Sequence, residues 1–214
     1  MRWPRIEGLY AITPDIADTA ALIRMARQIL VGGARLVQYR NKSATEALRL
    51  EQAHSLASLC REFRVPLIVN DHLDLAIEVS ADGVHLGFDD TPIAHARRKL
   101  GTRKIIGASC YNNLEQALEA EHQRADYVAF GAFFASTTKP HAVAATKELL
   151  RGAKALLRVP VVAIGGITAR NAMELINEGA DALAVSHAVF AASDVQSEAQ
   201  TFARLFERRD NFSH

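Results

Sequence analysis

The sequence predicts one α/β domain, spanning residues 1–214, with the (β/α)8 or TIM barrel fold. Short apolar runs alternate with helical segments eight times along the chain, and such alternation is typical of a parallel sheet. The runs are continuously apolar, as expected for strands buried on both faces. A length of 214 residues and a hydrophobic content of 49% suit one closed barrel with a filled core. An open, doubly wound sheet is the alternative fold.

The first half of the chain supplies four strand–helix units. Gly32-Gly33 ends the first helix, and Ser43-Ala44-Thr45-Glu46 has the pattern of a capping box at the start of the second helix. The elements of this half are expected at Leu9–Thr13, Thr19–Leu30, Arg35–Arg40, Ser43–Phe63, Pro66–Asn70, Leu73–Val79, Gly83–Leu86 and residues 92–100.

The second half repeats the pattern. Gly-Ala-Asp at 179–181 precedes the last strand as Gly-Ala-Arg at 33–35 precedes the second, which indicates equivalent units. The elements are expected at Lys104–Ser109, Leu114–His122, Asp126–Gly131, a helix ending near Leu157, Val161–Ile164, a helix with Ala172, Leu175 and Ile176 as its apolar positions, Ala182–Ser186 and Ser197–Glu207.

Composition and charge argue against several classes of partner. The formal net charge is +1, so neither nucleic acid nor a broad membrane surface is expected as a partner. No apolar run reaches transmembrane length, and the N-terminus lacks the apolar segment of a secretory signal. Cys60 and Cys110 do not make a disulfide framework, which favours a cytoplasmic setting. The sequence leaves the oligomeric state open, a homo-oligomer included.

A glycine pair follows the seventh expected strand. Gly165 and Gly166 lie between a buried strand and a helix for which Thr168 is the expected N-cap. Glycines let the backbone approach a ligand closely, and a helix N-terminus adds partial positive charge, so this loop suits a phosphate. The strand ending at Ser186 lies one unit further on, and paired loops after the last two strands of a barrel commonly bind phosphate. A tight turn without a ligand is the alternative.

Basic side chains end the second expected strand. Gln38, Arg40 and Lys42 are spaced by two residues, so they share one face while the chain stays extended. Two cations and an amide on one face suit a polyanion such as a diphosphate. A solvated strand end is the alternative.

Acidic side chains end the next two strands. Asn70-Asp71 closes the third strand, and Asp89-Asp90 lies just beyond the fourth. Carboxylates at neighbouring strand ends suit Mg²⁺, which prefers oxygen ligands and usually bridges to substrate phosphates. Their place beside basic groups therefore indicates a Mg²⁺-diphosphate between the two sets. The alternatives are that Asp71 caps a helix and that Asp89-Asp90 forms a turn.

Other polar residues fall at the same predicted end. Ser109 ends the fifth strand, where its hydroxyl suits a phosphate or the cap of the next helix. The loop Ser136-Thr137-Thr138-Lys139-Pro140 offers hydroxyls and a cation for an anion, or is simply a polar surface loop. Cys110 is expected to be a packed residue rather than a nucleophile. His72 and His85 are expected to support the site rather than bind a ligand.

Together these segments resemble the thiamine-phosphate synthase family. The resemblance runs from Leu9 to Phe190, and Gln38 to Lys42 looks like the family's Gln-x-Arg-x-Lys motif. It implies a (β/α)8 barrel that joins a hydroxymethylpyrimidine diphosphate to a thiazole phosphate, giving thiamine phosphate and diphosphate. The matching segments, in the expected order, are Val37–Lys42, Val69–Asp71, Gly83–Asp90, Ile106–Ser109, Thr137–Pro140 and Ile164–Ile167.

The resemblance also implies a role for each matching residue. Asp71 and Asp90 would bind Mg²⁺, and Arg40, Lys42 and Lys139 would act in catalysis by stabilising the departing diphosphate. The pyrimidine diphosphate would contact Gln38, Arg40, Lys42, Asn70, Ser109 and Lys139. The thiazole phosphate would be held by Ser136, Thr137, Thr138, Gly166 and the backbone around Ser186 and His187.

The sequence departs from the family pattern at two places. His141 stands where the family often has Asp, and Ser186-His187 replaces a more usual apolar-Ser pair, which affects the thiazole phosphate pocket. A related thiazole tautomerase is one rival function, but its catalytic His follows Phe-Gly, where this chain has Ala132. A catalytically silent barrel that binds thiamine-related phosphates is the other rival.

Overall fold

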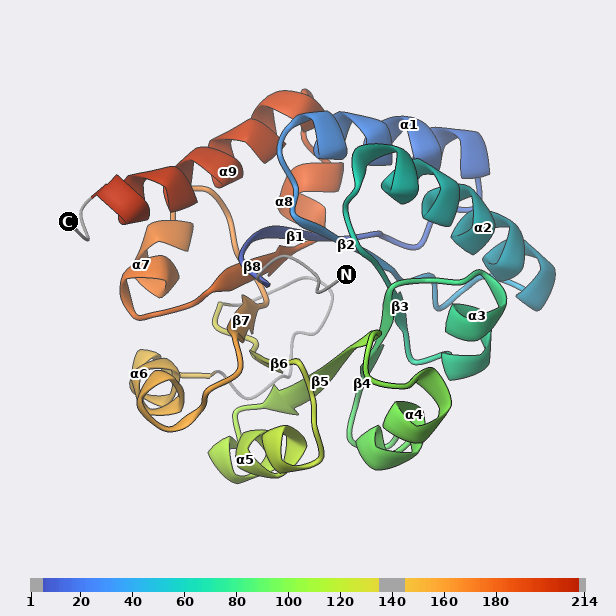
Figure 1. The fold of residues 1–214 in the computed structure, drawn as a ribbon. Coiled ribbons are helices and arrows are strands. Elements are labelled where there is room, and N and C mark those ends of the chain that lie inside the picture. Colours follow the sequence, from blue (N-terminus) through green and yellow to red (C-terminus); the bar gives the residue numbers. More distant parts are fainter. Residues whose placement is uncertain (1–5, 135–144, 212–214) are drawn as a thin grey trace.

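The chain folds as a closed barrel of eight parallel strands, as the sequence predicts (Figure 1). A computed structural model describes residues 6–134 and 145–211, without the side chains of 208–211. Each strand pairs with the next in the chain, and β8 closes the barrel against β1. The strands are β1 Gly8–Ile12, β2 Leu36–Tyr39, β3 Leu67–Asn70, β4 Gly83–Leu86, β5 Ile105–Tyr111, β6 Tyr127–Phe130, β7 Val161–Ile164 and β8 Ala182–Val185.

Helices surround the barrel, and α9 runs beside α1 (Figure 1). The short helix α8 was not predicted, because its four residues are too few to show a helical period. None of the helices in the described part of the chain combines the length and the apolar character needed to cross a membrane. The helices are α1 Thr19–Val31, α2 Glu46–Phe63, α3 Leu73–Glu78, α4 Ile93–Leu100, α5 Leu114–His122, α6 Lys147–Leu156, α7 Ala172–Asn177, α8 His187–Phe190 and α9 Val195–Asn211.

Two helix starts differ from the sequence predictions. Thr45 rather than Ser43 caps α2, because the Thr45 hydroxyl accepts a hydrogen bond from the Leu48 N–H at 3.3 Å while Ser43 donates to Asn41 in the preceding loop. Thr168 does not cap α7. Its N–H instead donates to the Asn171 side chain at 2.8 Å, because a turn separates Gly166 from the helix.

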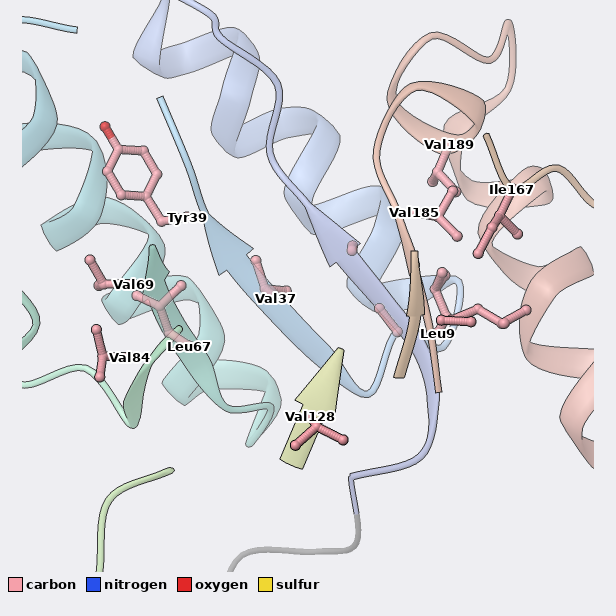
Figure 2. Packing of buried hydrophobic residues seen from close by; sticks show 14 of the residues in the cluster. Leu9, Val37, Tyr39, Leu67, Val69, Val84, Val128, Ile167, Val185 and Val189 are labelled. Atoms are coloured by element: carbon pink, nitrogen blue, oxygen red, sulfur yellow. The ribbon is translucent and has the colours of Figure 1, made fainter. Parts of the chain in front are cut away.

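The core has two layers, because successive strand side chains point to opposite faces of the barrel wall. Leu9 and Ala11 of β1 pack outward against the helices, whereas Tyr10 and Ile12 point into the barrel. Figure 2 shows the outer layer, in which Leu9, Val37 and Val185 belong to neighbouring strands of the wall. Both layers are buried, so the strands hold the C-terminal loops on a rigid base.

Aspartates fasten the opposite, N-terminal end of the barrel. Asp82, Asp126 and Asp181 each follow an alanine just before an even-numbered strand. Each carboxylate accepts the backbone N–H at or near the start of the preceding strand, from Leu67 at 2.9 Å and from Ile106 and Val161 at 2.7 Å. Polar residues at this end therefore serve the fold, which leaves the other end for a binding site.

Candidate functional site

A polar pocket lies at the C-terminal ends of β2 and β3. It brings together Arg40 and Lys42 from the first of these ends and Asn70 and Asp71 from the second, as predicted. Two cations thus lie beside a carboxylate and an amide around one space. The remaining lining residues are Tyr39, Asn41, Arg49 and His72.

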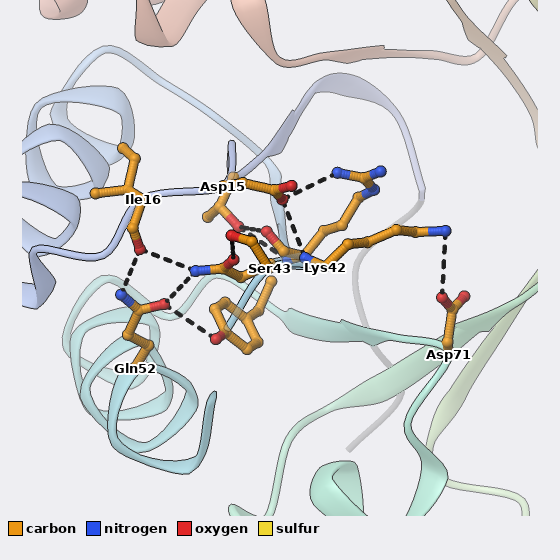
Figure 3. A network of polar contacts seen from close by, with 10 residues as sticks. Asp15, Ile16, Lys42, Ser43, Gln52 and Asp71 are labelled. Atoms are coloured by element: carbon orange, nitrogen blue, oxygen red, sulfur yellow. Dashed lines mark hydrogen bonds and ion pairs between the residues drawn. The ribbon is translucent and has the colours of Figure 1, made fainter. Parts of the chain in front are cut away.

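The loop after β1 holds the two cationic residues in place (Figure 3). The Thr13 hydroxyl donates to the Arg40 carbonyl and accepts from the Arg40 N–H, both at 2.8 Å. One Asp15 carboxylate oxygen accepts from the Lys42 backbone N–H at 3.0 Å and from the Arg40 guanidinium at 3.2 Å. Asp15 therefore supports both residues. It contacts Lys42 through the backbone N–H and not through the side-chain ammonium.

A buried glutamine ties this loop to helix α2 (Figure 3). Gln52 is fully buried; its side-chain oxygen accepts from Tyr39 and Asn41, and its amide donates to the Ile16 carbonyl at 2.8 Å. Asn41 also donates to Ile16 and accepts from Ser43. Sequence reasoning missed this role of Gln52, although a polar residue among the apolar positions of a helix is a usable signal.

Asp71 and Asp90 come together beside the pocket, as the sequence predicts. Burial and the nearby Asp90 carboxylate raise the pKa of Asp71, while the Lys42 ammonium, 3.9 Å away, opposes that rise. One Asp90 oxygen accepts from the Gly87 N–H at 2.7 Å. Asp71 does not cap α3, whose N-cap residue is His72. The Asp90 carboxylate thus disfavours the charged form of Asp71.

Gln38 and Ser109 lie deeper, at the top of the barrel interior. The extended backbone of β2 ends at Tyr39, so Gln38 points inward and donates to the Tyr10 hydroxyl at 2.8 Å rather than lining the pocket with Lys42. Ser109 contacts the His85 Nε2 atom at 2.9 Å. It does not cap α5, which Asn113 does. Burial lowers the pKa of His85 to about 4, so that histidine is a neutral, packed residue.

The glycine loop after β7 combines backbone strain with close packing. Gly165 and Gly166 have φ values of 101° and 64°, a left-handed conformation that favours glycine. A Cβ atom on Gly165 would lie 2.4 Å from the Ala132 Cβ, so the first glycine is required by packing against the end of β6. The second glycine accepts a hydrogen bond from the Asn171 side chain through its carbonyl.

The remaining candidates fall at β8 or outside the described residues. Ser186 precedes α8, and the exposed His187 opens that helix, so both follow β8 as predicted. Ser136, Thr137, Thr138, Lys139 and His141 lie outside the described residues, and their roles stay predictions. Within residues 6–134 and 145–211, no cluster of three or more His, Cys, Asp or Glu side chains is placed to hold a metal ion.

A closed parallel barrel with cations and an acidic pair at its C-terminal end defines an enzyme of the (β/α)8 class with a site for anionic substrates. The model of the thiamine monophosphate synthase family matches residues 9–189. The chain is 61% identical to a thiamine-phosphate synthase of Nitrosospira multiformis, over 95% of this chain and 87% of the relative. It is 54% identical to the enzyme of that name from Nitrosomonas eutropha, over 94% and 95% of the two chains.

A solved structure agrees with the sequence relatives. The thiamine phosphate pyrophosphorylase from Pyrococcus furiosus superposes with a TM-score of 0.82 at 38% identity, covering 94% of this chain and 96% of that one. The chain therefore belongs to the thiamine monophosphate synthase family, and it is a transferase of thiamine biosynthesis.

Proposed function

We propose that this chain couples a hydroxymethylpyrimidine diphosphate to a thiazole phosphate at the C-terminal mouth of the barrel, in a Mg²⁺-dependent reaction. The observation that carries the proposal is the pocket that joins Arg40 and Lys42 to Asn70 and Asp71, with Asp90 beside it. Cations bind the diphosphate directly, whereas carboxylates repel it unless a metal ion lies between. The two sets of charge thus suit one metal-bound diphosphate better than either suits a bare anion.

The acidic pair fits Mg²⁺. Asp71 and Asp90 offer oxygen donors close together. Burial first and the Asp90 carboxylate second raise the pKa of Asp71, and a cation bound there would oppose both effects. Mg²⁺ is usually bound by one or two carboxylates plus substrate phosphates rather than by a protein cage. When bound, it would neutralise charge on the diphosphate and assist its departure.

The protein's own part in the reaction is to position two substrates and to stabilise the leaving group. Diphosphate departs from a methylene carbon on an electron-rich aminopyrimidine, which supports a carbocation that the thiazole nitrogen then attacks. Arg40, Lys42 and Lys139 would stabilise the negative charge that develops on the leaving diphosphate. Asn70 and Ser109 would orient the same group, and Gln38 would lie at the inner end of the pyrimidine pocket.

No covalent nucleophile is needed. Cys110 is buried on β5, and burial raises the pKa of its thiol to about 12. A thiol of that pKa is protonated at neutral pH and therefore a poor nucleophile.

The thiazole phosphate would bind at the loops after β6, β7 and β8. Gly166 offers a backbone free of a side chain, and Ser186 and His187 open the next loop of the barrel. Ser136, Thr137 and Thr138 would add hydroxyls from the loop after β6. This is the common phosphate position of the fold, beside the last two strands.

The direct test is incubation of the purified chain with both substrates and Mg²⁺, with chromatography for thiamine phosphate. Formation of thiamine phosphate and diphosphate in equal amounts supports the proposal. Tight binding of both substrates without product would instead favour the silent barrel. The tautomerase has less support, since the position of its catalytic His holds Ala132, whose methyl group packs near Gly165.

A further inference from the structure

Five side chains from five strands form one continuous hydrogen-bonded chain through the barrel interior. The Gln38 amide donates to the Tyr10 hydroxyl at 2.8 Å, and that hydroxyl lies 2.7 Å from the Tyr127 hydroxyl. The Tyr127 hydroxyl lies 2.9 Å from His85 Nδ1, and His85 Nε2 lies 2.9 Å from the Ser109 hydroxyl. All but Ser109 are buried. The chain thus joins two residues that are proposed to contact the same substrate.

The donor at one end fixes the direction of every hydrogen bond. The Tyr10 hydroxyl accepts a hydrogen bond from the Gln38 amide, so it donates its own hydrogen bond to its other partner, the Tyr127 hydroxyl. The Tyr127 hydroxyl then donates its hydrogen bond to His85 Nδ1, so Nδ1 is the acceptor and carries no proton. A neutral imidazole with a bare Nδ1 carries its proton on Nε2, which donates to Ser109.

The opposite direction leaves a proton without an acceptor. If Ser109 donated to His85, Nδ1 would donate to Tyr127 and Tyr127 to Tyr10. Tyr10 would then accept twice, and its buried proton would have no acceptor among residues 6–134 and 145–211. A buried, unsatisfied hydroxyl proton is costly, so the first direction is favoured. Burial also raises the pKa of both tyrosines above the usual range, so both keep their protons at neutral pH.

We propose that these hydrogen-bonded side chains hold His85 as the Nε2–H tautomer. The Ser109 hydroxyl then accepts from His85, and its own proton stays free to donate to the diphosphate of the pyrimidine substrate. Tyr10, Tyr127 and His85 are then positioning residues that act through Ser109. A serine that donated to histidine would turn only lone pairs toward an oxyanion and would repel it. The identity of the anion rests on the proposed function, whereas the tautomer does not.

The tautomer is tested on the ligand-free wild-type chain by ¹⁵N NMR of its histidine rings. The His85 signals are assigned by their loss in His85→Gln. We expect a proton on Nε2 and a bare, acceptor-type Nδ1 at neutral pH. A protonated Nδ1 would overturn the proposal, and this measurement needs neither substrate nor turnover.

The effect on the substrate is tested with a double-mutant cycle of Tyr127→Phe and Ser109→Ala. Tyr127→Phe keeps the ring but removes the donor to Nδ1, so the KM for the pyrimidine diphosphate should rise about tenfold. The KM for the thiazole phosphate should stay near the wild-type value. In the Ser109→Ala background, Tyr127→Phe should add almost nothing, because its effect passes through the missing hydroxyl. Equal losses in both backgrounds would refute a role through Ser109.

If the wild type makes no thiamine phosphate, the proposed function fails, and the same cycle is run on Kd values for Mg²⁺-pyrophosphate.

Discussion

The Lys42 ammonium lies 3.9 Å from a carboxylate oxygen of Asp71, across the pocket at the ends of β2 and β3. The Lys42 side chain is 58% exposed, and an ion pair of this length and exposure contributes little to stability. Lys42 is therefore free to turn toward an anion in the pocket while Asp71 stays beside Asp90. The pocket thus combines an exposed, weakly paired cation with a carboxylate that lies beside a second carboxylate.

Removal of divalent cations should abolish the formation of thiamine phosphate, and added Mg²⁺ should restore it. Mg²⁺ should also raise the Tm of the substrate-free wild type, since a cation that binds the folded acidic pair and not the unfolded chain stabilises the fold. In Asp71→Asn the repulsion with Asp90 is gone, so Tm without metal should rise and Mg²⁺ should add little. Asp89→Asn is the matched control, because Asp89 is an exposed neighbour outside the pair. Full activity in excess chelator would refute the metal assignment. It would also be refuted if Asp89→Asn lost as much of the Mg²⁺-dependent rise in Tm as Asp71→Asn.

Gly166→Asp should weaken binding of the thiazole phosphate. The backbone here is left-handed, with φ at 64°, and Asp and Asn tolerate that conformation better than other residues. Asp places a negative charge where the phosphate is proposed to bind, so its KM should rise at least tenfold, about 1.4 kcal/mol. Gly166→Asn has the same size without the charge and should raise KM less. The measurement is steady-state kinetics with each substrate varied in turn. A change in the KM of the pyrimidine substrate alone would refute the assignment of the thiazole phosphate to this loop.

Lys139→Ala should lower kcat more than it raises either KM. The residue lies outside the described residues, and the prediction follows from its motif and its proposed contact with the leaving diphosphate. An interaction that strengthens in the transition state affects kcat, and loss of one such charged contact costs about 3 kcal/mol, roughly a hundredfold in rate. The Tm should change little, because the role predicted for Lys139 is a contact with the substrate and not with the rest of the fold. Unchanged kcat with unchanged Tm would remove Lys139 from the mechanism.

The barrel and the outer part of the site were predictable from the sequence. Alternation of short apolar runs with helical segments fixed the order of the strands, and the C-terminal ends of parallel strands meet at one edge. Arg40, Asn70 and Asp71 each directly follow or end such a run, so their convergence required only the fold. Strand boundaries were accurate to about two residues for the same reason.

The supporting contacts were not predictable, because they join residues that are distant in the sequence and lack a local pattern. Tyr10 and Tyr127 look like ordinary core aromatics, and only closure of the barrel brings their hydroxyls to 2.7 Å. Thr168 failed as a cap because the glycine turn uses extra residues before α7, which no propensity indicates. The packing of Gly165 against Ala132 was likewise not predictable, because it depends on the loop after β6.

Stability should fall in mildly acidic solution because of His85. Burial lowers the folded-state pKa of His85 from 6.5 to about 4. A depressed pKa contributes stability that is complete above pH 6.5 and is lost as the pH falls toward 4, because the unfolded chain takes up a proton that the folded chain refuses. Over this window the loss is about 3 kcal/mol.

His85→Gln should be less stable than the wild type at pH 7.5, yet its stability should depend less on pH. The measurement is urea unfolding by circular dichroism at pH 7.5, 6.5, 5.5 and 4.5, roughly spanning the two pKa values. Other groups titrate alike in both proteins, so the difference between the two curves isolates His85. A difference that stays constant with pH would show that His85 takes up its proton equally in both states, contrary to a buried, neutral imidazole.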